Sequence, residues 1–357
     1  MKRIAFHNRE TETKEIMDIL DDEPSLITLV YGPINSGKTT MISHLIKELP
    51  KNQKVFYINL RGRLISNYDE FIKVLFDVEH EARYERIKKF LKPMANVLPE
   101  SYSGIPIPKD LFLKLFKEKE VEDAFVYIET VLRAFYKNDQ NPVLVIDELQ
   151  VIGDLKIDGF LIYKLFNFFI RLTKELHLAH VFVITSDSLF LERVYTEAML
   201  SGRCRYLMVD DFDKDTTMSF LENYGFSEEE KELAWHYCGG KPVYLVELMR
   251  VEDKGEMVAK MLKIRTSQIS ELLNSLRAYG EEIEFRGELH EVVYDNVVAE
   301  LSKLKENVAC EYGHITPEIN YLVRNNIIFV DPLDNTMRSQ SRLDLLAIRE
   351  VMRDADA

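Results

Sequence analysis

Eight residues near the start of the chain combine glycines, a lysine and a threonine in a spacing that suits phosphate chemistry. Gly32-Pro33-Ile34-Asn35-Ser36-Gly37-Lys38-Thr39 matches the pattern G-x-x-x-x-G-K-[ST] at every specified position. Glycines let the backbone curl so that several N–H groups point at one phosphate. Lys38 then reaches the β- and γ-phosphates, and the Thr39 hydroxyl is a ligand for Mg²⁺. We therefore predict that this segment and the adjoining Thr40 hold ATP or ADP with Mg²⁺.

Two adjacent acids follow a second apolar run and supply what a bound triphosphate needs. Asp147 ends the run at 142–147, and Glu148 comes next. Because Mg²⁺ prefers oxygen ligands, we assign Asp147 to the metal, directly or through water. Glu148 then polarises the attacking water, which predicts hydrolysis as well as binding. The alternative is that both acids cap the helix that follows.

Polar residues also lie at the end of the apolar run at 180–185. In P-loop proteins such a strand usually lies between the P-loop strand and the strand that ends in the acids. Thr185 and Ser186 are therefore candidates for contact with the γ-phosphate or the water. Asp187 and Ser188 come directly after them and would instead cap the next helix.

An arginine closes the same part of the chain. Arg203 follows Gly202, and an arginine there can neutralise γ-phosphate charge, in cis or across a subunit interface. Arg205 competes for this role. An ordinary surface arginine is the alternative.

Alternating strands and helices must position these groups. The predicted strands are 25–31, 54–60, 142–147, 180–185 and a shorter 206–209. The predicted helices are 40–48, 68–76, 81–95, 121–136 and 159–176. Residues 98–110, rich in proline, glycine and serine, predict a loop or insertion. This order predicts an α/β fold, a parallel sheet with helices on both faces, as in P-loop NTPases. The unbroken apolar character of the strands agrees, because parallel sheets are covered on both sides.

The pattern changes after residue 209. Helices at 213–224, 228–238 and 243–250 predict a small helical lid. Helices at 267–278, 289–305 and 316–325 then precede a strand at 326–330, a turn and a closing helix at 343–353. We predict three domains: a P-loop core at 1–209, a lid at 210–262 and a winged-helix-like C-terminal domain at 263–357.

Composition limits the partners. Acidic side chains number 60 and basic ones 46, so the net charge is −14 and attraction to nucleic acid or anionic membranes is weak. No apolar run is long enough to span a bilayer, and no signal-like segment opens the chain. The three cysteines are widely spaced, as expected of free thiols in a reducing cytosol. We expect a cytoplasmic protein without membrane attachment.

With these residues in place, the chain resembles the archaeal ATPase family, among the STAND and AAA+-like P-loop NTPases. Phe6, Arg9 and Glu12 match the fixed positions of its opening box, F-x-x-R-x-x-E. The P-loop, the acids after 145–146, the strand-like 56–61 and Gly202-Arg203 match in order. So do Gly239-Gly240-Lys241-Pro242, which is similar to the family's G-G-x-P, and a tail with Pro332 and Gln340-Ser341-Arg342-Leu343.

The resemblance implies base-side contacts from Arg9 and Pro242. The family's usual glycine before the arginine is Asn8 here. It also implies a switch, in which nucleotide fixes the arrangement of core, lid and tail and hydrolysis releases it.

Three functions compete. The first is an ATPase switch that acts on a protein partner or on its own oligomer. The second is a DNA-binding regulator or replication-initiator-like protein that uses its tail, and the third is a nucleotide-binding module that barely turns over. Residues 251–357 hold 20 acids and 13 lysines plus arginines, a balance of −7 that speaks against DNA. Arg338 and Arg342 could form a small basic patch, and the lysines at 88–92 suit a solvated helix face.

Overall fold

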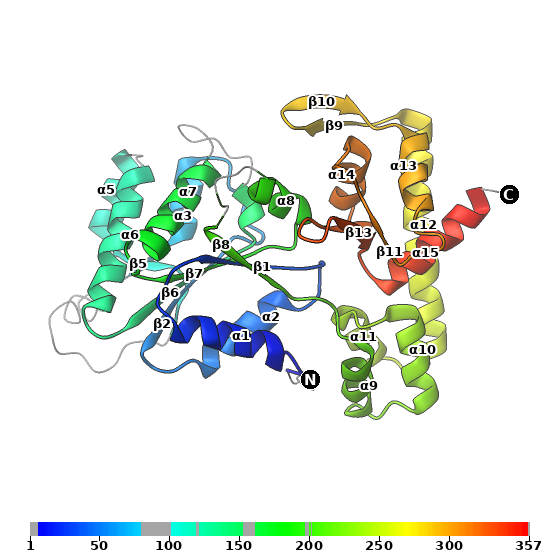
Figure 1. Cartoon of the computed structure of the whole chain (residues 1–357), viewed down its shortest axis with the longest axis horizontal. Coiled ribbons are helices and arrows are strands. Elements are labelled where there is room, and N and C mark those ends of the chain that lie inside the picture. Colours follow the sequence, from blue (N-terminus) through cyan, green and yellow to red (C-terminus); the bar gives the residue numbers. More distant parts are fainter. Residues whose placement is uncertain are drawn as a thin grey trace. The chain divides into compact units, whose positions relative to one another are not determined.

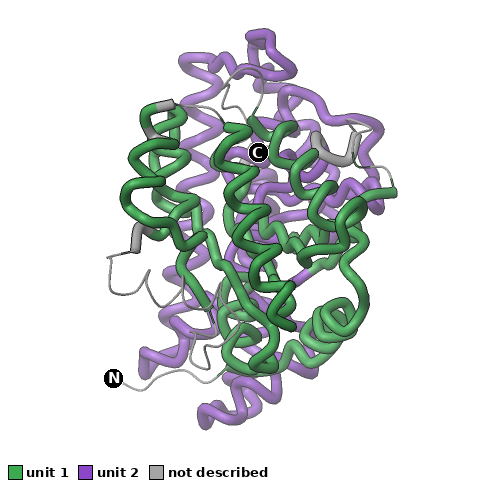
Figure 2. The backbone as a smooth tube through the Cα atoms, turned by 90° about the vertical axis from the view of Figure 1, so that its left-hand side faces the viewer, with its two compact units in different colours: residues 1–31, 38–185, 198–208 green, residues 32–37, 186–197, 209–357 purple. Residues whose placement is uncertain are grey.

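The computed structural model describes residues 6–79, 101–118, 121–152, 161–196, 200 and 202–355. The chain divides into two units, coloured separately in Figure 2. Unit 1 contains 1–31, 38–185 and 198–208, and unit 2 contains 32–37, 186–197 and 209–357. The P-loop residues Gly32–Gly37 therefore group with unit 2, whereas Lys38 and the acids at 147–148 group with unit 1.

Unit 1 is built on a six-stranded sheet in the order β4-β2-β6-β7-β1-β8. Its strands are β1 Ile27–Tyr31, β2 Gln53–Asn59, β4 Ser101–Tyr102, β6 Asn141–Asp147, β7 His180–Ile184 and β8 Cys204–Met208. Every neighbouring pair is parallel. The predicted parallel sheet is confirmed, and β7 lies between β1 and β6 as expected. Asn59 pairs with Asp147, which pairs with Ile184, so the carboxyl ends of three strands meet.

Helices cover both faces of this sheet (Figure 1). On one side lie α1 Glu10–Asp21 and α2 Lys38–Glu48, and on the other lie α3 Tyr68–Leu75, α6 Val121–Tyr136 and α7 Leu161–Ile170. Helix α6 buries an i, i+3/i+4 stripe that includes Ala124, Ile128 and Phe135. The buried residues thus recur at the helical spacing that the sequence pattern predicts. Helix α7 continues into a π-helical turn, Arg171–Glu175.

The loop predicted at 98–110 is wrong within the described residues. Besides β4, it contains β5 Ile105–Pro108, which pairs in parallel with the unpredicted β3 Phe76–Glu79, and helix α5 begins at Lys109 and ends at Glu118. The prolines fit because β5 pairs on one side only in this two-stranded sheet, where a missing N–H leaves no ladder bond unmade. Helix α1 was also not predicted. The predicted helix at 81–95, the lysines at 88–92 and the start of 159–176 lie outside the described residues.

The helices of unit 2 begin with α8 Ser188–Thr196, and the residues predicted as a lid then contain α9 Lys214–Glu222, α10 Glu228–Cys238, α11 Pro242–Leu248 and the start of α12 Lys254–Tyr279. Local capping starts α9 and α10: the Asp213 side chain accepts from the Thr216 N–H, and Ser227 and Glu230 form a capping box. Helix α12 has 26 residues and runs without a break across 262–263, where a domain boundary was predicted. The bounds of the three domains remain predictions.

The rest of unit 2 is a small α/β arrangement. After α12 come β9 Glu282–Phe285, β10 Glu288–Glu291, α13 Tyr294–Ser302, β11 Ala309–Glu311, α14 Pro317–Arg324, β12 Ile328–Asp331, β13 Thr336–Ser339 and α15 Arg342–Ala355. Strands β11, β13 and β12 form an antiparallel sheet in that order. Its apolar core includes Val297, Leu301, Tyr321, Leu322 and Ile348. The order helix, strand, helix, hairpin suits the winged-helix-like prediction, which stays a prediction.

The helix predicted at 289–305 is wrong at its start, because β9 and β10 form a hairpin there. Its two-residue turn, Arg286-Gly287, has φ values of 54° and 86°. Two positive φ values are the signature of the type I′ turn that joins tightly paired antiparallel strands.

In the described part of the chain, no helix combines the length and apolar character that crossing a bilayer requires. All three cysteines are free thiols, as the sequence predicts.

Candidate nucleotide-binding site

The loop between β1 and α2 curls through three residues with positive φ. Gly32, Asn35 and Gly37 have φ values of 150°, 61° and 98°. At Gly32 a Cβ would lie 2.2 Å from the Val209 carbonyl oxygen, so both the backbone angle and the space require glycine. The Ser36 N–H donates to the Pro33 carbonyl at 3.3 Å, which closes the turn. This loop conformation follows from the glycines in the motif.

Lys38 and Thr39 open helix α2, at the end whose free N–H groups favour anions. The Thr39 hydroxyl donates to Asp147 Oδ2 at 2.9 Å. The Tyr57 hydroxyl donates to the same oxygen at 2.7 Å. Lys38 is 4% exposed and Asp147 is 1% exposed. The structure thus brings together the predicted metal-binding pair, Thr39 and Asp147.

The second carboxylate oxygen of Asp147 is the notable atom of this cluster. Asp147 Oδ1 is buried and has no hydrogen-bond partner among the described residues. Burial raises the pKa of Asp147, and the hydrogen bonds from Tyr57 and Thr39 only partly oppose it. A buried carboxylate oxygen without a partner is unfavourable unless a cation or donor completes it.

Glu148 lies in different surroundings. Its Oε1 accepts from Nε of Arg61 at 3.0 Å and also from Nη2 of the same guanidinium. Its Oε2 accepts from the Gln150 side-chain amide, whose oxygen accepts from the Thr185 hydroxyl at 2.9 Å. The hydrogen bond to Glu148 raises the pKa of Arg61. A chain of polar groups therefore runs from the end of β2 to the end of β7.

The backbone at Glu148 is also unusual. Its φ is 63°, a left-handed angle in a residue that is not glycine. Its N–H donates to the Ile184 carbonyl at 2.9 Å. Such angles cost on the order of 1–3 kcal/mol and cluster at functional sites. The side chains of Asp147 and Glu148 bind these partners. They do not cap the short 3₁₀ helix Leu149–Ile152 that follows, so the alternative role of the two acids as helix caps does not hold.

Arg203 is placed away from this edge. It precedes β8, whose first residue, Cys204, pairs with Ile27 at the start of β1, whereas Tyr31 at the end of β1 pairs with Met208. Four residues of strand separate the two levels, roughly 13 Å at about 3.3 Å per residue. The strand register puts Arg203 at the opposite edge, which speaks against its contact with the γ-phosphate in cis, whereas contact across a subunit interface stays a prediction. Arg205 lies opposite Thr28, only one residue along from Cys204, and the same reason applies to it.

The tip of β7 has two outcomes. Thr185 takes part in the Glu148 network, whereas Ser186 is half-buried and its role stays a prediction. Asp187 caps α8, because its Oδ1 accepts from the N–H groups of Leu189 and Phe190 at 2.9 and 3.1 Å. Thr40 is exposed on α2.

The opening box is organised around Arg9, which is 6% exposed. Arg9 Nη1 donates to Glu12 Oε1 at 2.6 Å, so two box residues form an ion pair. Phe6 stacks on the His44 ring of α2 with centroids 4.0 Å apart. Asn8 has a φ of 58°, which explains why glycine suits this position and why asparagine replaces it at small cost. The base-side role of Arg9 remains a prediction.

The segment Gly239-Gly240-Lys241-Pro242 packs tightly within unit 2. At Gly240 a Cβ would lie 1.7 Å from the Phe212 carbonyl oxygen, and the Phe212 N–H donates to the Gly240 carbonyl at 3.0 Å. Pro242 is the first residue of α11, a position that needs no N–H. The predicted contact of Pro242 with the base stays a prediction. Within this segment, Lys241 is the residue that contacts the P-loop.

Four polar residues of these networks were given no role from sequence: Tyr57, Arg61, Gln150 and Lys241. Tyr57 and Arg61 lie on or just after β2, at alternating positions that face the ends of β6. The sequence signal for these two residues was their alternating position along β2 and just past its end, next to the strand that carries the predicted acids.

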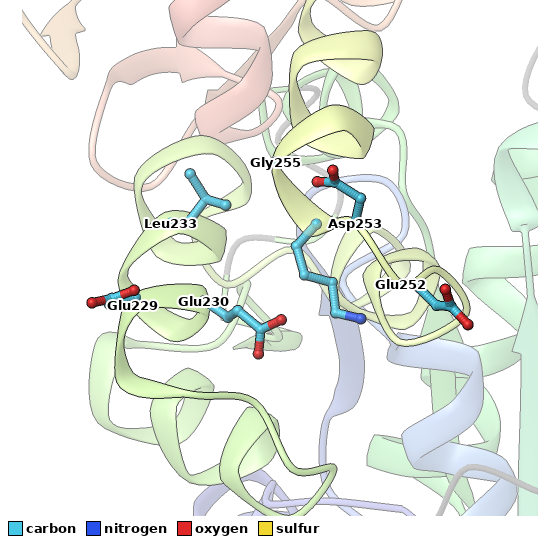
Figure 3. Close-up of a pocket in the computed structure, with 7 residues that line it drawn as sticks. Glu229, Glu230, Leu233, Glu252, Asp253 and Gly255 are labelled. Carbon is cyan, nitrogen blue, oxygen red and sulfur yellow. The ribbon is translucent and has the colours of Figure 1, made fainter.

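A surface depression elsewhere in unit 2 is acidic (Figure 3). Its lining includes Glu229, Glu230, Glu252 and Asp253 around Lys254. The Lys254 ammonium lies 5.0 Å from the centroid of the Phe226 ring. The excess of carboxylates repels phosphate, so this depression is not a second nucleotide site.

Comparison with known proteins agrees with this geometry. The family model described as an ATPase domain predominantly from Archaea matches residues 6–248, more than half of the chain. The chain belongs to the archaeal ATPase family. A second model, the C-terminal domain of MJ1010-like uncharacterized ATP-binding proteins, matches residues 255–352.

Relatives of this member of the family align over almost their full length. An uncharacterized ATP-binding protein of Pyrococcus abyssi is 46% identical over 348 residues, 97% of this chain and 98% of its own. One from Methanocaldococcus jannaschii is 44% identical and covers 98% of both chains. Among solved structures, a Walker-type ATPase of Pyrococcus abyssi matches with a TM-score of 0.63 and 20% identity, covering 98% of this chain and 97% of its own. At that identity the likeness shows the fold alone.

Proposed function

We propose that this archaeal ATPase binds ATP with Mg²⁺ at its P-loop and hydrolyses it to ADP and phosphate. The observation that carries the proposal is the contact between Thr39 and Asp147, with Asp147 Oδ1 buried and lacking a hydrogen-bond partner among the described residues. A hydroxyl and a carboxylate at hydrogen-bond distance are the oxygen donors that P-loop proteins use for Mg²⁺.

Thr39 and Asp147 would hold the metal, and the ion would neutralise charge on the phosphates. The raised pKa of Asp147 fits this assignment, because a cation restores the ionised form that burial disfavours. Lys38, buried at the start of α2, supplies a second positive charge on the phosphate side.

Glu148 is the base that the geometry supports. Its Oε1 already accepts two N–H groups of Arg61, whereas its Oε2 accepts one from Gln150. A carboxylate oxygen has two lone pairs, so Oε2 retains one for a water molecule. In the proposed step the water oxygen bonds to the γ-phosphorus, the bond to the β,γ-bridging oxygen breaks, and Glu148 Oε2 takes the proton.

We further propose that the chain works as a nucleotide-driven switch that acts on a protein partner or on another copy of itself. The γ-phosphate is the group that distinguishes ATP from ADP, so contacts with it would supply the differential binding that a switch needs. The balance of −7 over residues 251–357 gives no support to DNA as the main partner.

The experiment is a comparison of wild type, Glu148→Gln and Lys38→Ala in ATP binding and steady-state hydrolysis. Loss of a general base slows chemistry by about 10²–10⁴-fold, so Glu148→Gln is expected to bind ATP and barely hydrolyse it. Lys38→Ala is expected to lose binding. Equal hydrolysis by wild type and Glu148→Gln would contradict the assigned base, and full affinity in Lys38→Ala would contradict the phosphate site.

A further inference from the structure

Both backbone polar groups of one P-loop residue, Ile34, are bound by side chains from distant parts of the sequence. The Ile34 N–H donates to Gln340 Oε1 at 3.2 Å. The Ile34 carbonyl accepts from Lys241 Nζ at 3.0 Å. Ile34, Lys241 and Gln340 all belong to unit 2, and we call this arrangement the Ile34 clamp.

Gln340 is fixed in one orientation. It is 4% exposed, and its Nε2 donates to the Ile328 carbonyl of β12 at 2.9 Å. Its own N–H donates to the Ile327 carbonyl at 3.1 Å. The side-chain amide is therefore held from the β12 side while its oxygen faces the P-loop, and rotation by half a turn would break both contacts.

Lys241 is fixed as well. It is 2% exposed, and its ammonium lies 2.9 Å from Asp211 Oδ1. A buried ammonium needs such a partner, and the ion pair leaves its remaining hydrogens free to bind the loop carbonyl. Gly239 and Gly240 before it allow the close approach to Phe212 and Arg342 that sets its position.

The clamped residue, Ile34, precedes the left-handed point of the loop. Asn35 has a φ of 61°, which a residue other than glycine or asparagine adopts at a cost of roughly 1–2 kcal/mol. Fixing the two peptide groups that flank Ile34 favours that curl before any ligand arrives. A loop that is already curled spends less conformational entropy when it binds phosphate.

We propose that Gln340 and Lys241 are positioning residues for the phosphate-binding loop, and that the Ile34 clamp makes the β12–β13 region part of the nucleotide-binding machinery. The inference rests on the proposed function, since it concerns the same loop. By thermodynamic reciprocity, nucleotide that binds the curled loop also stabilises the clamp and the backbone of β12 that anchors Gln340. Nucleotide occupancy is then transmitted to the C-terminal sheet through one side chain.

The test uses Gln340→Met in the full-length chain, because methionine keeps the length of the side chain and removes both hydrogen bonds. We expect its affinity for ADP and for Mg²⁺·ATP to fall about tenfold, the change expected when one buried hydrogen-bonding contact is lost. In wild type, ADP should slow amide hydrogen exchange at residues 327–331. In Gln340→Met that nucleotide-dependent protection should disappear.

Ser339→Ala is the matched control, because Ser339 is the neighbouring buried residue and its hydroxyl binds the Ser341 carbonyl, not the loop. It should retain wild-type affinity and protection. A purely structural role for Gln340 would lower the unfolding temperature of the nucleotide-free variant but leave affinity and protection as in wild type, which would overturn the clamp. A wild-type chain that binds no nucleotide would instead refute the proposed function, and the clamp with it.

Discussion

The two edges of the six-stranded sheet use buried polar groups in opposite ways. At the carboxyl edge, Asp147 and Glu148 bind other side chains, and Asp147 keeps a buried oxygen without a hydrogen-bond partner among the described residues. At the amino edge, Gln53 donates to the Leu20 carbonyl at 3.3 Å, although its own Oε1 is buried without a hydrogen-bond partner among the described residues, and His180 forms a hydrogen bond with the Asp22 backbone. Two acids that bind other side chains prepare one edge for a ligand, whereas the uncharged Gln53 and His180 bind backbone groups and stabilise the other.

The comparison predicts its largest effect on folding at the amino edge. Burial lowers the pKa of His180 to about 4 from an ordinary value of 6.5. Between those two pH values the unfolded chain binds a proton at this residue that the folded chain does not. The free energy of unfolding should therefore fall as pH drops from about 6.5 to about 4, by about 3 kcal/mol in all.

Amide hydrogen exchange in β6 and β7 measures this loss. Tryptophan fluorescence would not report on this edge, because the only tryptophan, Trp235, lies in unit 2. His180→Asn should flatten the decline, whereas His44→Asn, on the partly exposed His44 of α2, should leave it unchanged. If the free energy of unfolding of His180→Asn falls with pH as steeply as that of wild type, this pH sensitivity does not arise at the amino edge.

A smaller effect is expected at the carboxyl edge from Arg61→Ala. Arg61 occupies both acceptor positions of Glu148 Oε1 and leaves only Oε2 for the water, so its removal should make both oxygens available and raise the rate of ATP hydrolysis severalfold. Its side chain is 60% exposed, so stability should change by no more than about 1 kcal/mol.

The measurement is turnover at saturating ATP, with Arg63→Ala as a neighbouring control that should match wild type. A drop in turnover of similar size would show that Arg61 holds Glu148 in its active position. In that case Arg61 would support the base at the carboxyl edge and would not restrain it.

The smallest effect is expected from Tyr57→Phe. The Tyr57 hydroxyl lowers the pKa of Asp147 against the larger effect of burial, so its removal raises that pKa further. The folded variant then holds its proton at Asp147 up to a higher pH, and Mg²⁺-dependent ATP affinity should weaken at a higher pH on acidification. Loss of the hydrogen bond itself should cost about 1 kcal/mol of stability. Titration of affinity between pH 5 and 8, roughly the range in which proteins are most stable, tests the shift, and an unchanged profile would contradict it.

Much of the core could be predicted because its signals are local. Unbroken apolar runs identify buried parallel strands, the glycine spacing predicts the curled loop between β1 and α2, and acids at a strand end predict which edge of the sheet a metal would use. Thr39 and Asp147, 108 residues apart, meet because both follow parallel strands at the same edge. The spacing of Phe6, Arg9 and Glu12 likewise anticipated an organised opening segment.

The rest depends on register, which no local pattern encodes. Arg203 lies next to a glycine in a familiar order, yet the pairing of β8 with β1 puts it at the amino edge. Arg61 meets Glu148 only because β2 and β6 pair with Asn59 opposite Asp147. Strand β5 was missed since its prolines are acceptable only on an unpaired side, and glutamates that favour helices conceal the β9–β10 hairpin.

The most direct measurement is calorimetric binding of ATP to wild type and to Asp147→Asn, each with and without Mg²⁺. The account predicts that Mg²⁺ strengthens ATP binding to wild type by about tenfold or more, the scale of one charge-assisted contact, and that Asp147→Asn loses this gain but keeps metal-free affinity. If Mg²⁺ strengthens binding equally in both proteins, Asp147 does not hold the metal and the proposed site is wrong.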